Sequence, residues 1–158
     1  MSGLGFVVLE ESETLIDWGL RTVKGEKNLA CLHIVESLIV HYNPSTLVVE
    51  NCQVKGCRRR QRVKNLIEDI MVLAKARRTK CRRVARLTVQ KAFSQDTAFT
   101  KHQIATNLAE RFPELARHLP RSRKAWMGED ARMSIFDALA LALTHQEKEL
   151  SMRPPPQE

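Results

Sequence analysis

Helical and strand patterns alternate along this sequence, and this alternation restricts its fold more than any other feature. Apolar residues recur at helical spacing in residues 28–42 and again in residues 63–74. Short apolar runs follow each helical pattern, at residues 46–49 and 84–89, and we interpret both as strands. Such an order predicts an α/β domain whose sheet is parallel in this half and covered by helices.

The two ends of the chain complete the expected order of elements. Apolar runs at residues 4–9 and 14–23, separated by polar residues, predict an antiparallel hairpin. Helices are expected over residues 101–112, ended by Pro113, and over residues 132–150. The chain of 158 residues suits one domain, which we place at residues 1–150. Residues 151–158 contain three consecutive prolines and are expected to be disordered.

The sequence lacks the patterns of a membrane or secreted protein. No stretch approaches the ~20 apolar residues that cross a bilayer, and the start does not resemble a signal peptide. We therefore expect a cytoplasmic protein without membrane contact. The four cysteines show no paired CxxC spacing and are interpreted as reduced thiols. Cys52 and Cys57, in a basic loop, are the one pair for which a metal site stays open.

Basic charge is concentrated in the middle of the chain. Residues 55–91 contain 14 basic and two acidic residues, whereas residues 1–54 contain three basic and seven acidic residues. This segregation favours contact with a polyanion such as a nucleic acid, although a solvated basic helix is an alternative. Several of these cations crowd a helix start, where phosphate groups would offset their unfavourable interaction with the helix dipole. The candidate nucleic-acid-binding residues are Lys55, Arg58, Arg59, Arg60, Arg62, Lys64 and Lys124.

Two acidic residues stand in positions where a carboxylate needs a partner. Asp137 lies in a helix that is apolar on nearly every face, so its charge must meet a cation or hydrogen-bond donors. The alternative to a functional site is an ion pair with an Arg or a hydrogen bond to a neighbouring loop amide. Glu50 directly follows a strand, and the carboxyl ends of strands border the ligand crevice in open α/β sheets. Alone it would be a surface acid, but the two together are oxygen ligands suited to Mg²⁺ or Mn²⁺.

Two further acids precede Asp137. Asp130 stands seven residues earlier, which places it on nearly the same helix face as Asp137, and Glu129 lies close to that face. We therefore include Glu129 and Asp130 among the candidate metal ligands, and Asp130 with Glu50 and Asp137 among the candidate catalytic residues. The alternative is that Glu129 or Asp130 caps the last helix or stands in its first turn.

Two short motifs resemble those of the RuvC-like Holliday junction resolvases, namely residues 46–50 (TLVVE) and residues 137–145 (DALALALTH). Residues 4–10 (LGFVVLE) and 15–22 (LIDWGLRT) resemble the second and third strands of the ribonuclease H-like fold of that family. The resemblance runs from Leu4 to His145. It implies a ribonuclease H-like α/β fold with a mixed sheet covered by helices.

The resemblance also implies a function. It predicts a homodimeric, divalent-metal-dependent endonuclease that cuts branched DNA in recombination and repair, with Glu50 and Asp137 matching two of the family's ligands. A sister group with this fold trims ribosomal RNA precursors, so structured RNA is the alternative substrate. An alternative from a different functional class is a non-catalytic nucleic-acid-binding protein, which would use the basic residues and need no metal.

The sequence departs from the family pattern in three places. The family's first ligand is an Asp on a central strand preceding residue 4, and that strand has no counterpart here. Ser134 stands where the family has another Asp, which leaves Asp130 or Glu129 to substitute. No aromatic residue occurs between Glu50 and Phe93, where the family carries one that enters the junction. We therefore expect a strand ending in Asp to be encoded upstream of Met1, and little activity without it.

Overall fold

The computed structural model describes residues 3–11, 13–94, 100–124 and 126–157. Its elements follow the order β1 (Gly3–Leu9), β2 (Leu15–Thr22), α1 (Lys27–Tyr42), β3 (Thr46–Glu50), α2 (Gln61–Ala76), β4 (Lys80–Val84), α3 (Arg86–Phe93), α4 (Lys101–Arg111), the 3₁₀ helix η1 (Pro113–His118) and α5 (Met133–Met152). None of the helices in these ranges is long and apolar enough to cross a membrane.

The strands form two separate pairs. β1 pairs antiparallel with β2, so that Gly3 lies opposite Thr22, which confirms the predicted hairpin. β3 pairs in parallel with β4, so that Glu50 lies opposite Val84. Among the described residues no ladder joins β1 to β3. The expected mixed sheet is therefore present as two halves.

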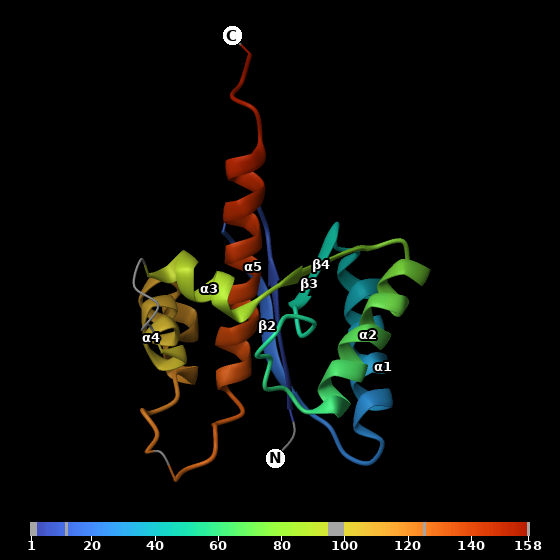
Figure 1. The fold of residues 1–158 in the computed structure, drawn as a ribbon, viewed down its shortest axis with the longest axis vertical. Helices are drawn as coiled ribbons and strands as arrows, with labels where there is room; N and C mark the ends of the chain where they lie inside the picture. The colour runs from blue at the N-terminus through green and yellow to red at the C-terminus, as the bar shows by residue number, and fades with distance from the viewer. Residues whose placement is uncertain (1–2, 12, 95–99, 125, 158) are drawn as a thin grey trace.

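Helices cover both faces of the strand layer. In Figure 1, α1 and α2 lie on one side of the strands, whereas α5, α3 and α4 lie on the other. Side chains of β3 alternate between the two cores: Leu47 and Val49 pack with α1 and α2, while Val48 packs with the core built on α5. The chain thus has three layers, with helices on either side of the strands.

One predicted strand is wrong. Residues 84–89 do not form a strand, because β4 ends at Val84 and α3 begins at Arg86. Val84 and Val89 both reach the α5 core, the first from a strand end and the second from a helix face. The sequence pattern did not predict β4 because it is an edge strand. Its exposed positions are the charged Lys80 and Arg82, which break up the apolar run expected of a strand.

Two other expectations need adjustment. All five residues of β3 are half-buried rather than buried on both faces, because the edge that faces β1 borders a cavity. α5 begins at Met133 and continues through Met152, two residues beyond its expected end. Residues 153–157, in the expected disordered tail, are exposed and contain no helix or strand.

The start of α5 packs tightly on β1. A Cβ added at Gly5 would overlap the backbone of Ser134, so only glycine fits between this strand and this helix. The contact matters for the acidic site described below, because it fixes α5 one turn before Asp137.

We expect Gly5→Ala to lower the free energy of unfolding by about 1 to 3 kcal/mol, because the added methyl group overpacks the β1–α5 contact. Gly128→Ala is the matched control, since a Cβ there would meet nothing within 4 Å, and its effect should stay within about 0.5 kcal/mol. Urea unfolding of both variants measures the difference. Equal stability of the two would mean that β1 and α5 are not in close contact.

Candidate functional site

Glu50 lies at the carboxyl end of β3, as expected, and its side chain is held by the loop that follows. Arg59 Nε donates a hydrogen bond to Glu50 Oε2 over 2.7 Å, and the side chain of Glu50 is 18% exposed. The Cys52 thiol lies 3.6 Å from the same oxygen. The loop between β3 and α2 therefore folds back over the strand end and supplies the carboxylate with a cation.

Asp137 lies in the second turn of α5 and shares a cation with Glu129. Lys101 Nζ is 3.2 Å from Asp137 Oδ2 and 2.9 Å from Glu129 Oε1. Lys101 is the first residue of α4, whose start is fixed by a capping box between Thr100 and Gln103. The cap of α4 thus places a lysine against two acids that belong to the segment at the start of α5.

The acids differ in how the protein shifts their pKa. Burial raises the pKa of Asp137, and the nearby charge and hydrogen bond of Lys101 only partly counter this effect. Burial acts in the same direction on Glu129, but the hydrogen bond and charge of Lys101, with the charges of Arg59 and Arg123, lower its pKa overall. Glu129 is therefore the ionised partner of Lys101, whereas Asp137 is the carboxyl group that holds a proton more readily.

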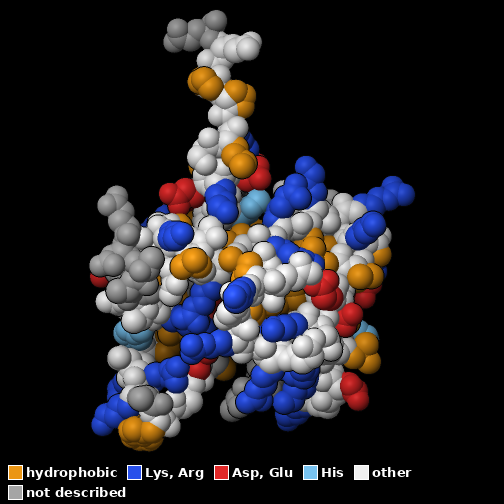
Figure 2. All heavy atoms as spheres, in the orientation of Figure 1, with side chains coloured by type: hydrophobic (Ala, Val, Ile, Leu, Met, Phe, Trp, Pro, Cys, Tyr) orange, Lys and Arg blue, Asp and Glu red, His pale blue; other side chains and the backbone are white. Residues whose placement is uncertain are grey.

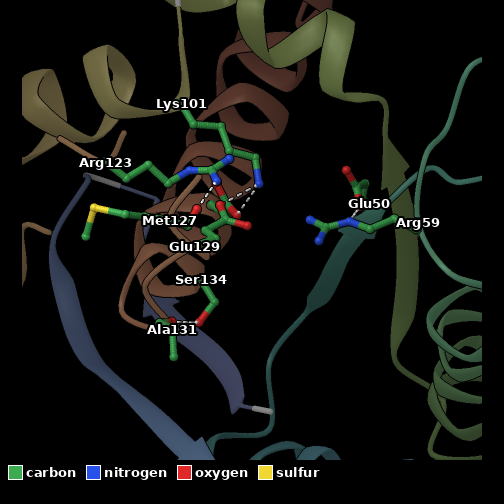
Figure 3. Close-up of polar contacts among 9 residues, drawn as sticks. Glu50, Arg59, Lys101, Arg123, Met127, Glu129, Ala131 and Ser134 are labelled. Carbon is green, nitrogen blue, oxygen red and sulfur yellow. Dashed lines mark hydrogen bonds and ion pairs between the residues drawn. The ribbon is translucent and has the colours of Figure 1, made fainter. Parts of the chain in front are cut away.

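Glu50 and Asp137 meet at one small cavity. The cavity has a volume of about 60 Å³ and is lined by both acids together with Arg59, Arg86 and Lys101. Figure 3 shows Glu50 and Arg59 on one side, with the Arg59 guanidinium pointing toward Lys101 and Glu129 on the other. The two acids therefore line one cavity, as expected, and three cations line the same cavity.

Asp130 does not lie on the α5 face that carries Asp137. It precedes the helix, which begins only at Met133, so the helical spacing used to align it with Asp137 does not apply. Its carboxylate accepts hydrogen bonds from the backbone N–H of Arg132 over 2.9 Å and from the Arg132 guanidinium over 2.6 Å. Asp130 forms a turn with Arg132 before the helix, so the alternative that it caps α5 or stands in its first turn is also wrong. Glu129 is the acid that joins Asp137.

The arginines before and at the start of α2 divide into two groups. Arg59 binds Glu50, and Arg62 Nη1 donates to Asn28 Oδ1 over 2.8 Å. In the described ranges, the side chains of Arg58 and Arg60 make no hydrogen bond or ion pair, and both are exposed. The same holds for the side chains of Lys55 and Lys124, whereas that of Lys64 is half-buried and also makes no hydrogen bond or ion pair among the described residues. Lys and Arg side chains spread over much of the face seen in Figure 2.

The described residues do not form a complete metal site. Within residues 3–157, apart from the masked positions, no three His, Cys, Asp or Glu side chains lie together closely enough to hold a metal ion. Mg²⁺ can be bound by one or two protein carboxylates when substrate phosphate supplies further oxygens. Here, however, Arg59 and Lys101 already occupy oxygens of Glu50 and Asp137. As they stand, these two carboxylates are held by protein cations rather than arranged around a metal ion.

Sequence reasoning missed Lys101 and Arg86. Lys101 bonds to Asp137 across 36 positions of the chain, and Arg86 reaches the same cavity from the start of α3. The capping-box pattern at Thr100 and Gln103 could have located the start of α4. No sequence signal indicated that α4 would begin against α5, because that contact depends on tertiary packing.

Comparison with solved structures identifies the fold. The structure of Thermus thermophilus RuvC matches over 98% of this chain and 92% of that chain, with a TM-score of 0.66 and 17% sequence identity. The same organism's RuvC in complex with a Holliday junction substrate matches 98% of this chain and 91% of that chain, with a TM-score of 0.62. This chain has a RuvC-like, ribonuclease H-like fold. Neither a protein-family model nor a curated protein sequence matches it.

The opposite pKa shifts of Asp137 and Glu129 predict opposite effects on stability. The folded-state pKa of Asp137 is raised, so its ionisation costs stability as the pH rises from about 4, the ordinary Asp pKa, through the raised value. Asp137→Asn removes this cost, so its stability relative to the wild type should increase with pH over that range. Glu129 has a lowered pKa and contributes stability above about 4.3 that is lost at more acidic pH.

Glu129→Gln should consequently lose stability relative to the wild type as the pH rises. Urea unfolding of the wild type and both variants from about pH 3 to pH 8, in EDTA, measures these differences. If both variants shift in the same direction over this range, the assignment of the two carboxyl groups is wrong.

Proposed function

We propose that this protein is an endonuclease that hydrolyses phosphodiesters in branched DNA and depends on Mg²⁺ or Mn²⁺. The observation that carries the proposal is the meeting of Glu50 and Asp137 at one cavity, in a chain with a RuvC-like fold. The neighbour solved with a Holliday junction substrate supports branched DNA as the first substrate to test. Roles in recombination and repair, and a homodimer, stay predictions.

The cations around the cavity suit a phosphate-containing ligand. Arg59, Arg86 and Lys101 line the cavity with the two acids, so a phosphodiester drawn there would meet donors from three different elements. Arg58 and Arg60 lie beside Arg59 and have no partner in the described part of the chain, which leaves them for phosphates further along the strand. Burial raises the pKa of Asp137, so this carboxyl group holds a proton more readily than an ordinary Asp.

A second candidate function is nucleic-acid binding without cleavage. The absence of a three-ligand group among the described residues favours it, as do the ion pairs that already engage Glu50 and Asp137. Structured RNA is the alternative substrate, because ribonuclease H-like folds also include RNA-processing nucleases. The experiment must therefore separate binding from cutting and DNA from RNA.

Labelled four-way DNA junctions, matched duplexes and structured RNA, each incubated with Mg²⁺ and then with EDTA, distinguish these functions. We expect junction cleavage that requires the metal. Asp137→Asn should lower the cleavage rate at least about a hundredfold, because a carboxylate that acts on the reacting phosphate contributes several kcal/mol, while binding persists. Asp69→Asn, an exposed change of the same chemistry on α2, is the control. Binding without cutting under all conditions would favour the non-catalytic protein.

The arginines without partners should determine the salt dependence of binding. Changing Arg58 and Arg60 to Ala should reduce the slope of log affinity against log salt by about 0.9 for each lost contact with duplex phosphate. Arg77→Ala is the matched control, because Arg77 is paired with Glu36 on the α1–α2 side. Titrations at several salt concentrations measure the slopes. An unchanged slope for the Arg58 and Arg60 variant would place the binding surface elsewhere.

A further inference from the structure

An exposed tryptophan stands in the segment between η1 and α5. Trp126 is 79% exposed, and its indole makes no hydrogen bond among the described residues. It belongs to neither hydrophobic core, whereas Trp18, the other tryptophan of the chain, packs against the core built on α5. Single exposed apolar side chains are common, so the surroundings of Trp126 decide whether its exposure has a function.

The turn that carries Trp126 is closed by two hydrogen bonds. The backbone N–H of Met127 donates to the carbonyl of Lys124 over 3.0 Å, and Arg123 Nη1 donates to the carbonyl of Met127 over 2.8 Å. A Cβ added at Gly128 would meet nothing within 4 Å, so the position after Met127 also has open space beside it. The indole is therefore presented to solvent by a hydrogen-bonded turn.

The charges around Trp126 are all positive. Residues 115–128 contain no acidic residue and four basic ones, namely Arg117, Arg121, Arg123 and Lys124. Arg121 and Lys124 are exposed and make no hydrogen bond or ion pair within the described part of the chain. A nucleic acid offers both an aromatic face for the indole and phosphates for these cations.

The turn is joined to the acidic site at the start of α5. Glu129 follows Met127 by two residues and binds Lys101 over 2.9 Å. Figure 3 shows Arg123 extending toward Lys101 and Glu129, while the side chain of Met127 points away from them. A nucleic acid bound at the site would therefore lie close to the turn that presents Trp126.

The indole and its position favour one class of partner. A paired base in a duplex is stacked on both faces by its neighbours, whereas an unpaired base can leave a face free for an aromatic side chain. An anionic membrane surface would also attract basic residues and an indole. The cations that line the neighbouring cavity with Glu50 and Asp137 favour a ligand that reaches into the site with a phosphate group.

We propose that Trp126 stacks on an unpaired base of a bound nucleic acid, while Arg121 and Lys124 bind the phosphates next to that base. The inference deepens the proposed function and rests on its nucleic-acid ligand. Contacts with phosphates carry no information about base pairing, so Trp126 adds a preference for substrates that contain unpaired bases.

Binding in EDTA to two DNA substrates tests the stacking. One is a fully paired duplex, and the other is the same duplex with a bulge of unpaired bases. Trp126→Ala should weaken binding of the bulged duplex at least about fivefold and change binding of the paired duplex less than about twofold. Trp126→Phe should restore most of the affinity, because it keeps an aromatic face. Met152→Ala is the control, since Met152 is a similarly exposed apolar residue at the end of α5.

Three further readouts separate stacking from a general structural role. A bulge of abasic nucleotides keeps the phosphates and removes the bases, so the losses from this bulge and from Trp126→Ala should not add. Binding of the bulged duplex should quench tryptophan fluorescence in the wild type but not in Trp126→Phe, which retains only Trp18. The salt dependence of binding should be the same for Trp126→Ala as for the wild type, because the indole is uncharged.

The outcomes separate this inference from the nuclease function. An equal loss for the paired and bulged duplexes, or no loss, would overturn the stacking and leave the nuclease standing if junctions are still cut. Base stacking without cleavage would support the inference and favour the non-catalytic protein. Failure of the wild type to bind any of these DNAs would overturn both. Binding to anionic phospholipid vesicles that depends on Trp126, without binding to DNA, would instead assign the turn to a membrane surface.

Discussion

The packing of α5 along β1 is the constraint on which the rest of the structure depends. One end is fixed where Gly5 meets Ser134, and the other where Gln146 bonds to the carbonyl of Glu10. Phe136 and Leu139, on the buried face of the same helix, anchor it in the larger core. Because the helix cannot rotate or slide without losing these contacts, Asp137 has one position relative to the strands, and that position is at the end of β3.

The acids at this position are already neutralised by the protein. Arg59 and Lys101 provide each candidate ligand with a cation from outside its own element, which limits the cost of partly buried carboxylates. Both acids thus have cation partners without any ligand, and these cations line the cavity at which the acids meet. If the proposed divalent ion binds here, it must compete with these cations for the same oxygens, so its binding would be coupled to the binding of phosphate by the same cations.

Several elements of the site could be predicted from local patterns. Asp137 was identified because a carboxylate in an apolar helix needs a partner, and Glu50 because it directly follows a strand. Local sequence patterns did not predict the features of the site that depend on tertiary packing. Glu129 and Asp130 both precede α5, so helical spacing could not show that Glu129, and not Asp130, would reach Lys101. Periodicity could not locate β4, because charged residues occupy its exposed positions.

The lysine at the start of α4 has a consequence for the dynamics of that helix. Lys101 stands in the first turn, where the helix dipole disfavours a cation, and Glu129 and Asp137 compensate for it. Occupancy of the acids by another cation would remove this compensation and leave the first turn of α4 held chiefly by its Thr100 capping box. By thermodynamic linkage, fraying of this turn must in return change the affinity of the acids for cations. The opening of one helical turn and the ionic state of the site are therefore coupled equilibria.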